Sequence, residues 1–470
     1  MNERPLHELS IPQAARLLRE GAITSVKLTE AALARVALLD PHLHAFITLT
    51  PDRAMADARQ ADAAFSRGID HGPLQGIPYA LKDIIDTAAI RTTAQSRLLL
   101  DHVPSRDAVV AAKLREVGGV LLGKLATYEF AVVGPSFDLP FPSARNPWNV
   151  AHITGGSSSG AAAAVGGGLV RTTLGTDTGG SIRSPAGYCG VVGLKPTYGL
   201  VSRRGVHPLA YSMDHVGPLS ASVEEAAMTL DAIAGLDVDD PGSAHRAGEP
   251  ASSRLGRELR GMRLGYARKF HLDEPEASPE VISALDDAVS QLSLLGAAIE
   301  EVDLPAYQIF EDCGAVIIAA EAYAIHEQQL RRRAAEYGRL AYLCLAAGVA
   351  LSAADLVQAQ RVRSQLCETV NGDVFAGLDA LIVANTLTTA PRFDTFDGIT
   401  PKWTAMRTLP FNVTGNPVLA LPIGLARNGL PMSMQIVGKP FDEAKLCQIG
   451  AAYETSIDWP ALRPPPLASR

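Results

Sequence analysis

The chain has 470 residues, 47% of them hydrophobic and 20% charged, a composition typical of a soluble globular enzyme that excludes a disordered or fibrous protein. Its formal net charge of −8, without a basic stripe, argues against nucleic acid as a main partner. Five scattered cysteines without CxxC spacing argue against a disulfide framework or a zinc site, and no apolar run approaches the roughly 20 residues that span a bilayer.

The N-terminal residues are charged and lack a long apolar core, so we expect no secretory signal. The scattered cysteines fit reduced thiols in the cytosol. We therefore predict a cytoplasmic protein that requires no metal, no other cofactor and no membrane.

Helical periodicity dominates the beginning of the chain, where Ser10 and Ser25 are placed as N-caps. The predicted helices are residues 6–19, 26–39 and 52–66. A turn and a strand follow at residues 73–86, with Lys82 near the strand end. Most lysines lie on the surface, but apolar neighbours such as Leu81 and Ile84 predict that this one is buried.

A helix at residues 108–116 and a strand at 120–123 come next, and residues 118–124 imitate a phosphate-binding P-loop. Leu125 occupies the place where that motif needs Ser or Thr to hold magnesium, and Lys124 ends a strand rather than opening a helix. We therefore reject nucleotide binding.

Residues 128–148 form an aromatic-rich loop with two interpretations. The rings either pack in the core beneath the loop or line a substrate pocket, since pockets are largely apolar. The pocket hypothesis assigns substrate contacts to Tyr128, Phe130, Phe137 and, further along, Tyr188.

Residues 154–195 are the most informative stretch, because they contain Gly-Gly-Ser turns at 155–157 and 179–181. Paired glycines adopt backbone conformations that other residues resist, and they let a ligand approach main-chain amides. A serine directly after such a pair can lie at the focus of several N–H groups, as an oxyanion requires. The two turns therefore indicate acyl-transfer chemistry.

Around these turns and beyond them, strands and helices alternate, which predicts an α/β sandwich. The expected helices are residues 158–168, 181–188, 220–235, 279–295, 308–337, 340–349, 353–375 and 441–453. The expected strands are residues 169–173, 263–266, 298–302, 380–384, 418–421 and 432–437. A polar connector lies at 237–257, and the long loop 385–402 is expected to be a pocket wall or lid.

The string GTDTGGSIR at residues 175–183 resembles the signature of the amidase signature family, serine hydrolases that cleave amides. A Gly-x-Pro…Lys-Asp context supplies the lysine of that family as Lys82. Lys82 precedes Ser157 by 75 residues, and Ser157 precedes Ser181 by 24, which matches the family spacing. Ser159 departs from the pattern, because the family usually has glycine there.

This resemblance extends over nearly the whole chain and implies its fold. The expected fold class is α/β, with one large mixed, twisted β-sheet covered by helices on both faces. We expect a single domain over residues 1–470 that consists of a helical part at about 1–70, a signature core at about 74–220 and a C-terminal α/β part at about 260–470. A homodimer is also implied.

The resemblance further implies a catalytic triad of Ser181, Ser157 and Lys82, with a cis peptide between Gly156 and Ser157. A lysine acts as a base only when neutral. Because its reference pKa is about 10.4, removing its proton at neutral pH costs roughly 4 kcal/mol. Burial can lower a lysine pKa by about 3 to 5 units, which is sufficient. In this hypothesis Ser181 attacks the carbonyl while its proton passes through Ser157 to Lys82.

The residues beside the nucleophile have supporting roles in this hypothesis. Asp177 and Arg183 are expected to pair and brace the loop, and Ser158 to hydrogen-bond Lys82 or the loop. The N–H groups expected to hold the oxyanion are those of Thr178, Gly179 and Gly180.

Two alternatives compete with a free-standing amidase that acts on a small-molecule aryl or alkyl amide, an ester or a carbamate. Residues 156–160 match G-x-S-x-G. This motif would make Ser158 the nucleophile, and its base would be one of the downstream histidines His207, His215 or His271. That motif requires a preceding buried strand, which residues 146–152 do not resemble. The second alternative is the glutaminase component of a tRNA-dependent amidotransferase, a branch of the same family that works only with a partner protein.

Overall fold

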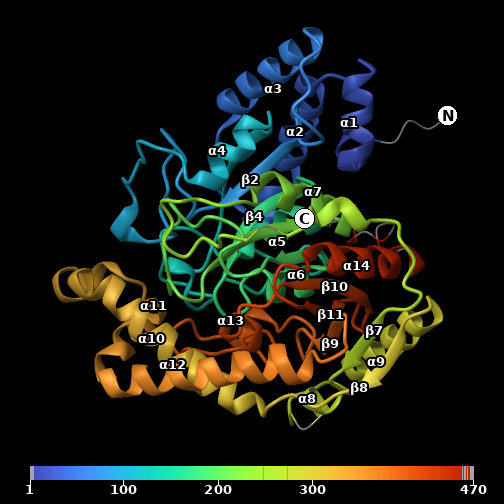
Figure 1. Ribbon diagram of the computed structural model, residues 1–470. Coiled ribbons are helices and arrows are strands. Elements are labelled where there is room, and N and C mark those ends of the chain that lie inside the picture. The colour runs from blue at the N-terminus through green and yellow to red at the C-terminus, as the bar shows by residue number, and fades with distance from the viewer. Residues whose placement is uncertain are drawn as a thin grey trace.

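The computed structural model describes residues 5–246, 248–272, 274–457, 459, 462 and 464–465. Within these residues, the strands form one 11-stranded sheet in the order β1-β3-β2-β4-β6-β5-β10-β11-β9-β7-β8 (Figure 1). They are β1 (Phe46–Leu49), β2 (Pro78–Lys82), β3 (Val120–Leu125), β4 (Thr172–Asp177), β5 (Val192–Lys195), β6 (His215–Ser220), β7 (Arg263–Tyr266), β8 (Ala298–Glu301), β9 (Ala380–Ala384), β10 (Val418–Leu425) and β11 (Pro431–Gly438).

The sheet is mixed, because β2 pairs in parallel with β3 and β4, whereas β6 pairs antiparallel with β4 and β5. The α-helices are α1 (Ile11–Arg19), α2 (Ser25–Leu43), α3 (Pro51–Ser66), α4 (Val109–Glu116), α5 (Ser159–Gly166), α6 (Arg183–Cys189), α7 (Val223–Ile233), α8 (Lys269–Leu272), α9 (Pro279–Leu294), α10 (Tyr307–Arg332), α11 (Arg339–Ala346), α12 (Ala353–Glu368), α13 (Pro410–Val413) and α14 (Glu443–Ile457).

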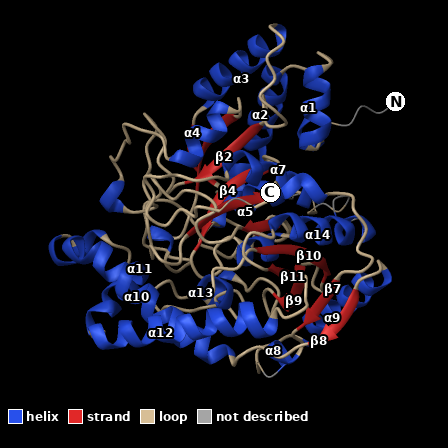
Figure 2. Ribbon diagram, in the orientation of Figure 1, coloured by secondary structure: helices blue, strands red, loops and turns tan. Residues whose placement is uncertain are grey.

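Helices cover both faces of the sheet (Figure 2). Side chains alternate along a strand, so Tyr79 and Leu81 of β2 pack into the cluster formed with α1, α4, α7, α9 and α14, while Ala80 packs into the cluster formed with α2, α3, α5 and α6. In β9, Ile382 joins the first cluster and Leu381 joins a third, formed with α10, α12 and α13. The expected α/β fold with one mixed sheet between two helical layers is therefore confirmed.

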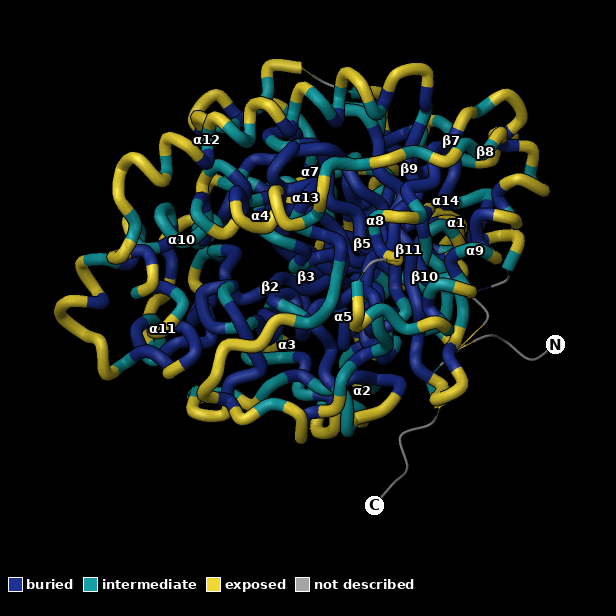
Figure 3. Tube along the Cα trace, turned by 90° about the horizontal axis from the view of Figure 1, so that it is seen from below, coloured by how far each residue is buried: buried dark blue, intermediate teal, exposed yellow. Residues whose placement is uncertain are grey.

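Burial follows this layering. Seen from below, the central strands and α5 lie in the buried interior, and the exposed residues are on outer elements such as α12 and the edge strand β8 (Figure 3). All five residues of β2 and all six of β4 are buried. A polar side chain on either strand therefore lies in a nearly water-free environment.

The predicted helix starts are half right. Ser10 caps α1 by accepting a hydrogen bond from the Gln13 N–H, as expected. The cap of α2 is Thr24, which accepts from the Lys27 N–H at 3.1 Å. Ser25 instead lies inside the helix and donates to the Gly76 carbonyl at 2.9 Å, so the prediction that Ser25 is the cap is wrong.

The strand predictions miss the centre of the sheet. β5 and β6 were not predicted, because glycines and Pro218 within them lower strand propensity. β1 was also missed, and β4 spans Thr172–Asp177 rather than residues 169–173. Tertiary pairing thus overrides weak local signals at β4, β5 and β6.

No single helix among the described residues has the length and apolar character needed to cross a membrane. One pair, Arg339–Ala350 with Ala353–Val374, meets the criteria of length and composition only when both segments are taken together, and it bends by 97°.

Candidate active site

Lys82 is the last residue of β2 and is completely buried. Its Nζ donates to Ser157 Oγ at 2.7 Å and to Thr176 Oγ1 at 2.8 Å. Thr176 belongs to β4, which pairs with β2 in parallel, so the two strands deliver these side chains to the same edge of the sheet. Two hydroxyl groups, rather than a carboxylate, surround this amine.

Burial lowers the pKa of Lys82 to about 7, and the charges of Asp177 and Asp214 oppose that shift. None of the carboxylates in the described part of the chain lies within salt-bridge distance of this amine. Asp83, the next residue, pairs with Lys124 at 3.2 Å instead. A substantial fraction of the Lys82 amine is therefore neutral near pH 7.

Ser157 lies on the turn that precedes α5 and is 1% exposed. The Gly156–Ser157 peptide bond is cis, as the sequence resemblance implied. A Cβ atom on Gly156 would lie 2.3 Å from the ring of Tyr128, so only glycine fits at this position. The Tyr128 N–H donates to the Ser157 carbonyl at 3.1 Å, which ties the aromatic loop to this turn.

Ser181 lies on the second Gly-Gly-Ser turn, two residues before α6, and is partly exposed. The two turns are joined because the Ser158 N–H donates to the Ser181 carbonyl at 3.2 Å. No hydrogen bond links the Ser157 and Ser181 hydroxyls in the described residues. The structure thus brings Lys82 and Ser157 into contact and places Ser181 on the adjoining turn, open to solvent.

The backbone N–H groups of the Ser181 turn differ in whether they have a hydrogen-bond acceptor. The Gly180 N–H donates to Asp177 Oδ1 at 2.8 Å, so the prediction that this amide is free to hold an oxyanion is wrong. The N–H groups of Thr178, Gly179 and Ser181 have no acceptor among the described residues. Asp177 instead uses the Gly180 amide to fix the turn.

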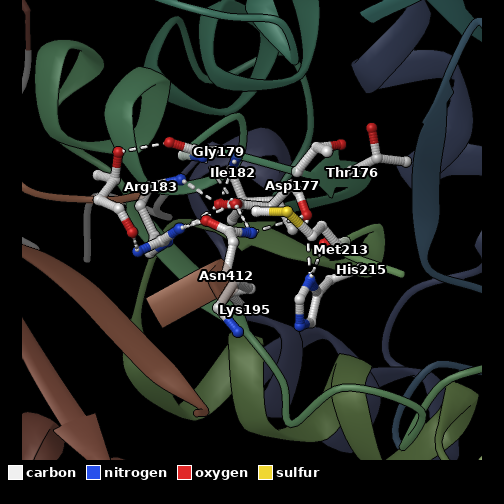
Figure 4. A network of polar contacts seen from close by, with 12 residues as sticks. Thr176, Asp177, Gly179, Ile182, Arg183, Lys195, Met213, His215 and Asn412 are labelled. Atoms are coloured by element: carbon white, nitrogen blue, oxygen red, sulfur yellow. Dashed lines mark hydrogen bonds and ion pairs between the residues drawn. The ribbon is translucent and has the colours of Figure 1, made fainter. Parts of the chain in front are cut away.

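Asp177 and Arg183 form a fully buried ion pair at 2.9 Å (Figure 4). Arg183 also donates to the Thr408 carbonyl and to Gln435 Oε1, both at 2.7 Å. Burial alone would raise the pKa of Asp177, but the charges of Arg183 and Lys195 and a hydrogen bond from Asn412 outweigh it and hold this pKa well below its usual range. The expected pair is present, and it is a hub with partners from the C-terminal part.

Ser158 is buried and bonds to the backbone of β4. Its Oγ donates to the Thr176 carbonyl at 3.1 Å and accepts from the Thr176 N–H at 3.2 Å, so it supports the turn rather than Lys82. No histidine among the described residues contacts this hydroxyl, and His215 Nδ1 lies against the carbonyls of Asp177 and Met213. The G-x-S-x-G alternative therefore has no catalytic base.

The departure at Ser159 has a steric explanation. Ser159 is the first residue of α5 and accommodates a side chain there. A Cβ atom on the next residue, Gly160, would lie 2.3 Å from the Ala45 carbonyl oxygen and 2.5 Å from the Ala126 nitrogen. Only the second position of the pair requires glycine.

The four candidate substrate contacts lie in different places. Tyr128 lies next to Gly156, and Phe137 is 53% exposed and packs near Phe393. Phe130 is buried among His207, His326 and Tyr337. Tyr188 is completely buried in a cluster with Trp148 and Trp459. Phe130 and Tyr188 are therefore core residues, and the prediction that they line a pocket is wrong.

A pocket of about 380 Å³, including space open to solvent, adjoins the end of β4. Thr176 and Thr178 form one side, and apolar side chains including Ile84, Val206 and Leu209 form much of the rest. Asp214 also lines it, and burial raises the pKa of this carboxyl to about 6 although Thr178 Oγ1 donates to it at 2.6 Å. The enclosed part of this space is only about 30 Å³, which holds one or two water molecules rather than an organic group.

Several residues of this site were missed in the sequence. Thr176 could have been identified, because it lies in the same string as Asp177 and on a strand parallel to that of Lys82. Asn412 and Gln435 carry no local signal. In the described residues, no group of three or more His, Cys, Asp or Glu side chains is placed to hold a metal ion.

A family model described as "Amidase" matches residues 27–447. The chain is 38% identical over 479 residues to a Roseiflexus sp. (strain RS-1) protein named as a subunit of glutamyl-tRNA(Gln) amidotransferase, covering 97% of each chain. A Chloroflexus aurantiacus protein of the same name is 38% identical over 484 residues, covering 98% of this chain and 99% of the relative.

Two solved structures resemble this fold closely. The native peptide amidase of Stenotrophomonas maltophilia superposes with a TM-score of 0.84 at 31% identity, over 98% of this chain and 99% of that one. A bacterial aryl acylamidase of the amidase signature family superposes with a TM-score of 0.87 at 25% identity, over 98% of this chain and all of that one.

Proposed function

Because the chain belongs to the amidase family, whose members act on C–N amide bonds, we propose that it hydrolyses carboxylic amides through an acyl-enzyme on Ser181, with Ser157 and Lys82 as the proton relay. The observation that carries this proposal is the 2.7 Å contact between the buried Lys82 amine and Ser157 Oγ. An amine with its pKa near 7 can accept a proton at neutral pH and return it later.

In the first step, Ser181 Oγ attacks the carbonyl carbon and gives its proton to Ser157 Oγ, which gives its own proton to neutral Lys82. The tetrahedral intermediate collapses when the relay returns a proton to the leaving amine, and the C–N bond breaks. Water then attacks the acyl-enzyme carbonyl and gives its proton to the relay; the ester bond to Ser181 Oγ breaks, the relay returns the proton to this oxygen, and the carboxylic acid leaves. Ser181 Oγ must approach Ser157 Oγ for the first transfer, a contact that can tighten when substrate binds.

The developing oxyanion is stabilised by amides of the Ser181 turn. The N–H groups of Thr178, Gly179 and Ser181 have no acceptor within the described residues and are candidates for this role. The Asp177–Arg183 pair braces the turn and takes no part in proton transfer. Preorganised donors of this kind typically contribute about 10²- to 10³-fold in rate each.

A fluorophosphonate probe tests the proposal directly. We expect a single covalent adduct on Ser181 after peptide mapping, and loss of labelling in Ser181→Ala. The matched control is Ser158→Ala, which removes a neighbouring buried hydroxyl and should still be labelled. An adduct on Ser158, or an active Ser181→Ala enzyme, would refute the assignment.

Glutamine hydrolysis as a component of an amidotransferase is the second candidate. The named relatives at 38% identity over nearly the whole chain favour this candidate over a free-standing amidase. Both candidates use the same acyl-enzyme on Ser181 and differ in the amide that is cleaved and in the fate of the ammonia. The chemistry above therefore holds for either.

The surface next to the Ser181 turn favours an uncharged substrate. A Cβ atom built on Gly179 would meet only Leu409 Cδ1 at 3.5 Å and Ile318 Cδ1 at 3.9 Å. An ammonium or carboxylate group placed directly on this apolar surface would lose hydration, and its nearest ionic partners would be Asp214 and Arg203 in the adjoining pocket. This patch suits the aryl or alkyl part of an amide, ester or carbamate, whereas Asp214 and Arg203 of the adjoining pocket suit the charged groups of glutamine.

A substrate panel separates the two candidates. The purified chain is assayed alone with a p-nitroanilide, a fatty amide, a carbamate and glutamine. Turnover of the first three without glutaminase activity supports the free-standing amidase, whereas glutamine hydrolysis only with added partner protein supports the amidotransferase component. Sedimentation velocity tests the proposed homodimer, which predicts a particle of twice the chain mass.

A further inference from the structure

The peptide unit between Gly179 and Gly180 is held at both of its polar ends. Its carbonyl oxygen accepts a hydrogen bond from Thr408 Oγ1 at 2.6 Å. Its N–H donates to Asp177 Oδ1 at 2.8 Å. The two anchors come from opposite directions along the chain, because Thr408 lies 229 residues beyond Gly179.

This peptide unit is the one in the turn that is easiest to reverse. Both flanking residues are glycines, and Gly180 has a φ of +135°. Glycine pays little steric cost in either orientation, so the peptide plane between two glycines can rotate when nothing holds it. A reversed plane would exchange the positions of its N–H and its carbonyl oxygen.

Such a reversal would damage the proposed oxyanion site. The free N–H groups of Gly179 and Ser181 flank this peptide on either side. The carbonyl oxygen would then face the Asp177 carboxylate, so the turn would lose both anchors and the flanking N–H groups would lose their fixed orientation. Preorganised donors are effective only when their orientation is fixed before the reaction.

Thr408 is itself fixed by the buried ion pair. Its backbone carbonyl accepts from Arg183 Nη1 at 2.7 Å, and Arg183 pairs with Asp177. The contacts thus close a ring from the Gly179 carbonyl through Thr408, Arg183 and Asp177 back to the Gly180 N–H. Thr408 is completely buried and so close to the turn that a Cβ atom on Gly180 would lie 2.2 Å from its Oγ1.

We infer that Thr408 is a positioning residue for the oxyanion turn: its hydroxyl holds the Gly179 carbonyl and thereby fixes the orientation of the flanking N–H groups. It acts through the Gly179–Gly180 peptide and does not touch the substrate. The inference rests on the proposed acyl-enzyme at Ser181, because only that reaction places an oxyanion at this turn.

The test compares Thr408→Val with Thr408→Ser. Valine keeps the shape and removes the hydroxyl, whereas serine keeps the hydroxyl and removes a methyl group. A fluorophosphonate is the probe, because its phosphoryl oxygen occupies the oxyanion position during reaction with Ser181 whatever the natural substrate is. We expect Thr408→Val to slow inactivation by about 10- to 100-fold and Thr408→Ser to restore it to within about 3-fold of wild type.

Steady-state kinetics with an accepted anilide give a second readout. Thr408→Val should lower kcat by a similar factor and leave KM within about 2-fold, since ground-state binding does not use the oxyanion donors. Thr414→Val is the matched control, because Thr414, the residue that caps the end of α13, donates its Oγ1 to the Pro410 carbonyl without contacting the turn. If Thr408→Val fails to fold, Thr408→Ala removes the hydroxyl without the valine methyl group.

Three outcomes would overturn the inference. Folded Thr408→Val could be inactivated by the fluorophosphonate as fast as wild type, or folded Thr408→Ser could be slowed as much as Thr408→Val. The third outcome is a Thr408→Val enzyme in which only KM increases. Failure of the acyl-enzyme proposal looks different, because Ser181→Ala would then keep its activity or its labelling. The two failures are therefore distinguishable with the same probe.

Discussion

Lys82 and Asp83 are adjacent in the chain, yet their side chains do not pair. The Lys82 amine contacts the hydroxyls of Ser157 and Thr176, and the Asp83 carboxylate takes Lys124 at 3.2 Å as its partner. A carboxylate beside Lys82 would hold it as an ammonium ion and prevent proton acceptance. The division of partners between these neighbours leaves the Lys82 amine without an adjacent counter-charge that would hold it protonated.

The first prediction concerns the pH dependence of kcat/KM. Only the neutral amine accepts a proton, so activity should rise as pH increases through about 7, where burial places the Lys82 pKa. Lys82→Met should lower kcat/KM by about 10²- to 10⁴-fold, the range of general-base catalysis. The control is Lys269→Met, an exposed lysine paired with Asp303. A flat profile from pH 5 to 9 would remove Lys82 from the mechanism.

The second prediction uses Asp214 to shift that profile. The negative charge of Asp214 raises the Lys82 pKa against the effect of burial. Asp214→Asn should therefore move the acid limb of kcat/KM to lower pH, while Asp303→Asn on the surface leaves it in place. An acid limb displaced to higher pH in Asp214→Asn would contradict the electrostatic argument.

The third prediction concerns the buried ion pair. Asp177→Asn leaves Arg183 buried without its counter-charge and should lower the free energy of unfolding at pH 7 by about 3 to 5 kcal/mol. Urea denaturation measures this loss. Asp394→Asn, which removes an exposed partner of Arg392, should leave the midpoint almost unchanged.

The sign of the pH effect follows from the depressed pKa of Asp177. Its stabilisation is fully present above the unfolded-state pKa, about 3.9, and is lost as pH falls toward the folded-state value. The stability difference between wild type and Asp177→Asn should therefore narrow below about pH 4. A difference that grows in acid would show that Asp177 is not charged in the folded protein.

The fourth prediction concerns Glu129, a buried carboxyl that binds the start of α11. It accepts from Ser96 Oγ at 2.6 Å and from the Gly338 N–H at 2.8 Å. Burial raises its pKa to about 7, although both hydrogen bonds oppose the shift. The folded state then binds a proton more tightly than the unfolded state, so stability falls as pH rises from about 4 to 7.

Glu129→Gln cannot titrate and should lose this decline. Thermal unfolding from pH 4 to 8 measures it, with Glu327→Gln, on the exposed surface of α10, as the control. A Glu129→Gln protein whose stability changes with pH as in wild type would assign the decline to other groups.

The sequence predicted well those parts of the site that a short motif encodes. Lys82, Ser157 and Ser181 could be named because each lies in a local string whose spacing is informative, and their catalytic roles stay a prediction. Thr408 and Gln435 could not be found, since they reach Arg183 from 225 and 252 residues away without any pattern of their own. Contacts at that range depend on the order of strands in the sheet.

The fold class was predictable from alternation, but the central strands were not. β5 has four residues and β6 contains Pro218, so their strand conformation comes from pairing with β10 and β4 rather than from propensity. The aromatic rings show the same limit, because composition cannot distinguish buried Tyr188 from exposed Phe137. The division into parts at about 1–70, 74–220 and 260–470 stays a prediction.

The partners of Arg183 tie the Ser181 turn to a distant part of the chain. A nascent chain that already contains Lys82, Ser157 and Ser181 still lacks Thr408, Asn412 and Gln435. Arg183 has its full set of hydrogen bonds only when these three residues are present. A chain halted before these residues has the Ser181 turn but lacks the hydrogen bonds that they accept from Arg183. Under the proposed mechanism, a chain truncated before Thr408 should therefore show little activity although it contains Lys82, Ser157 and Ser181.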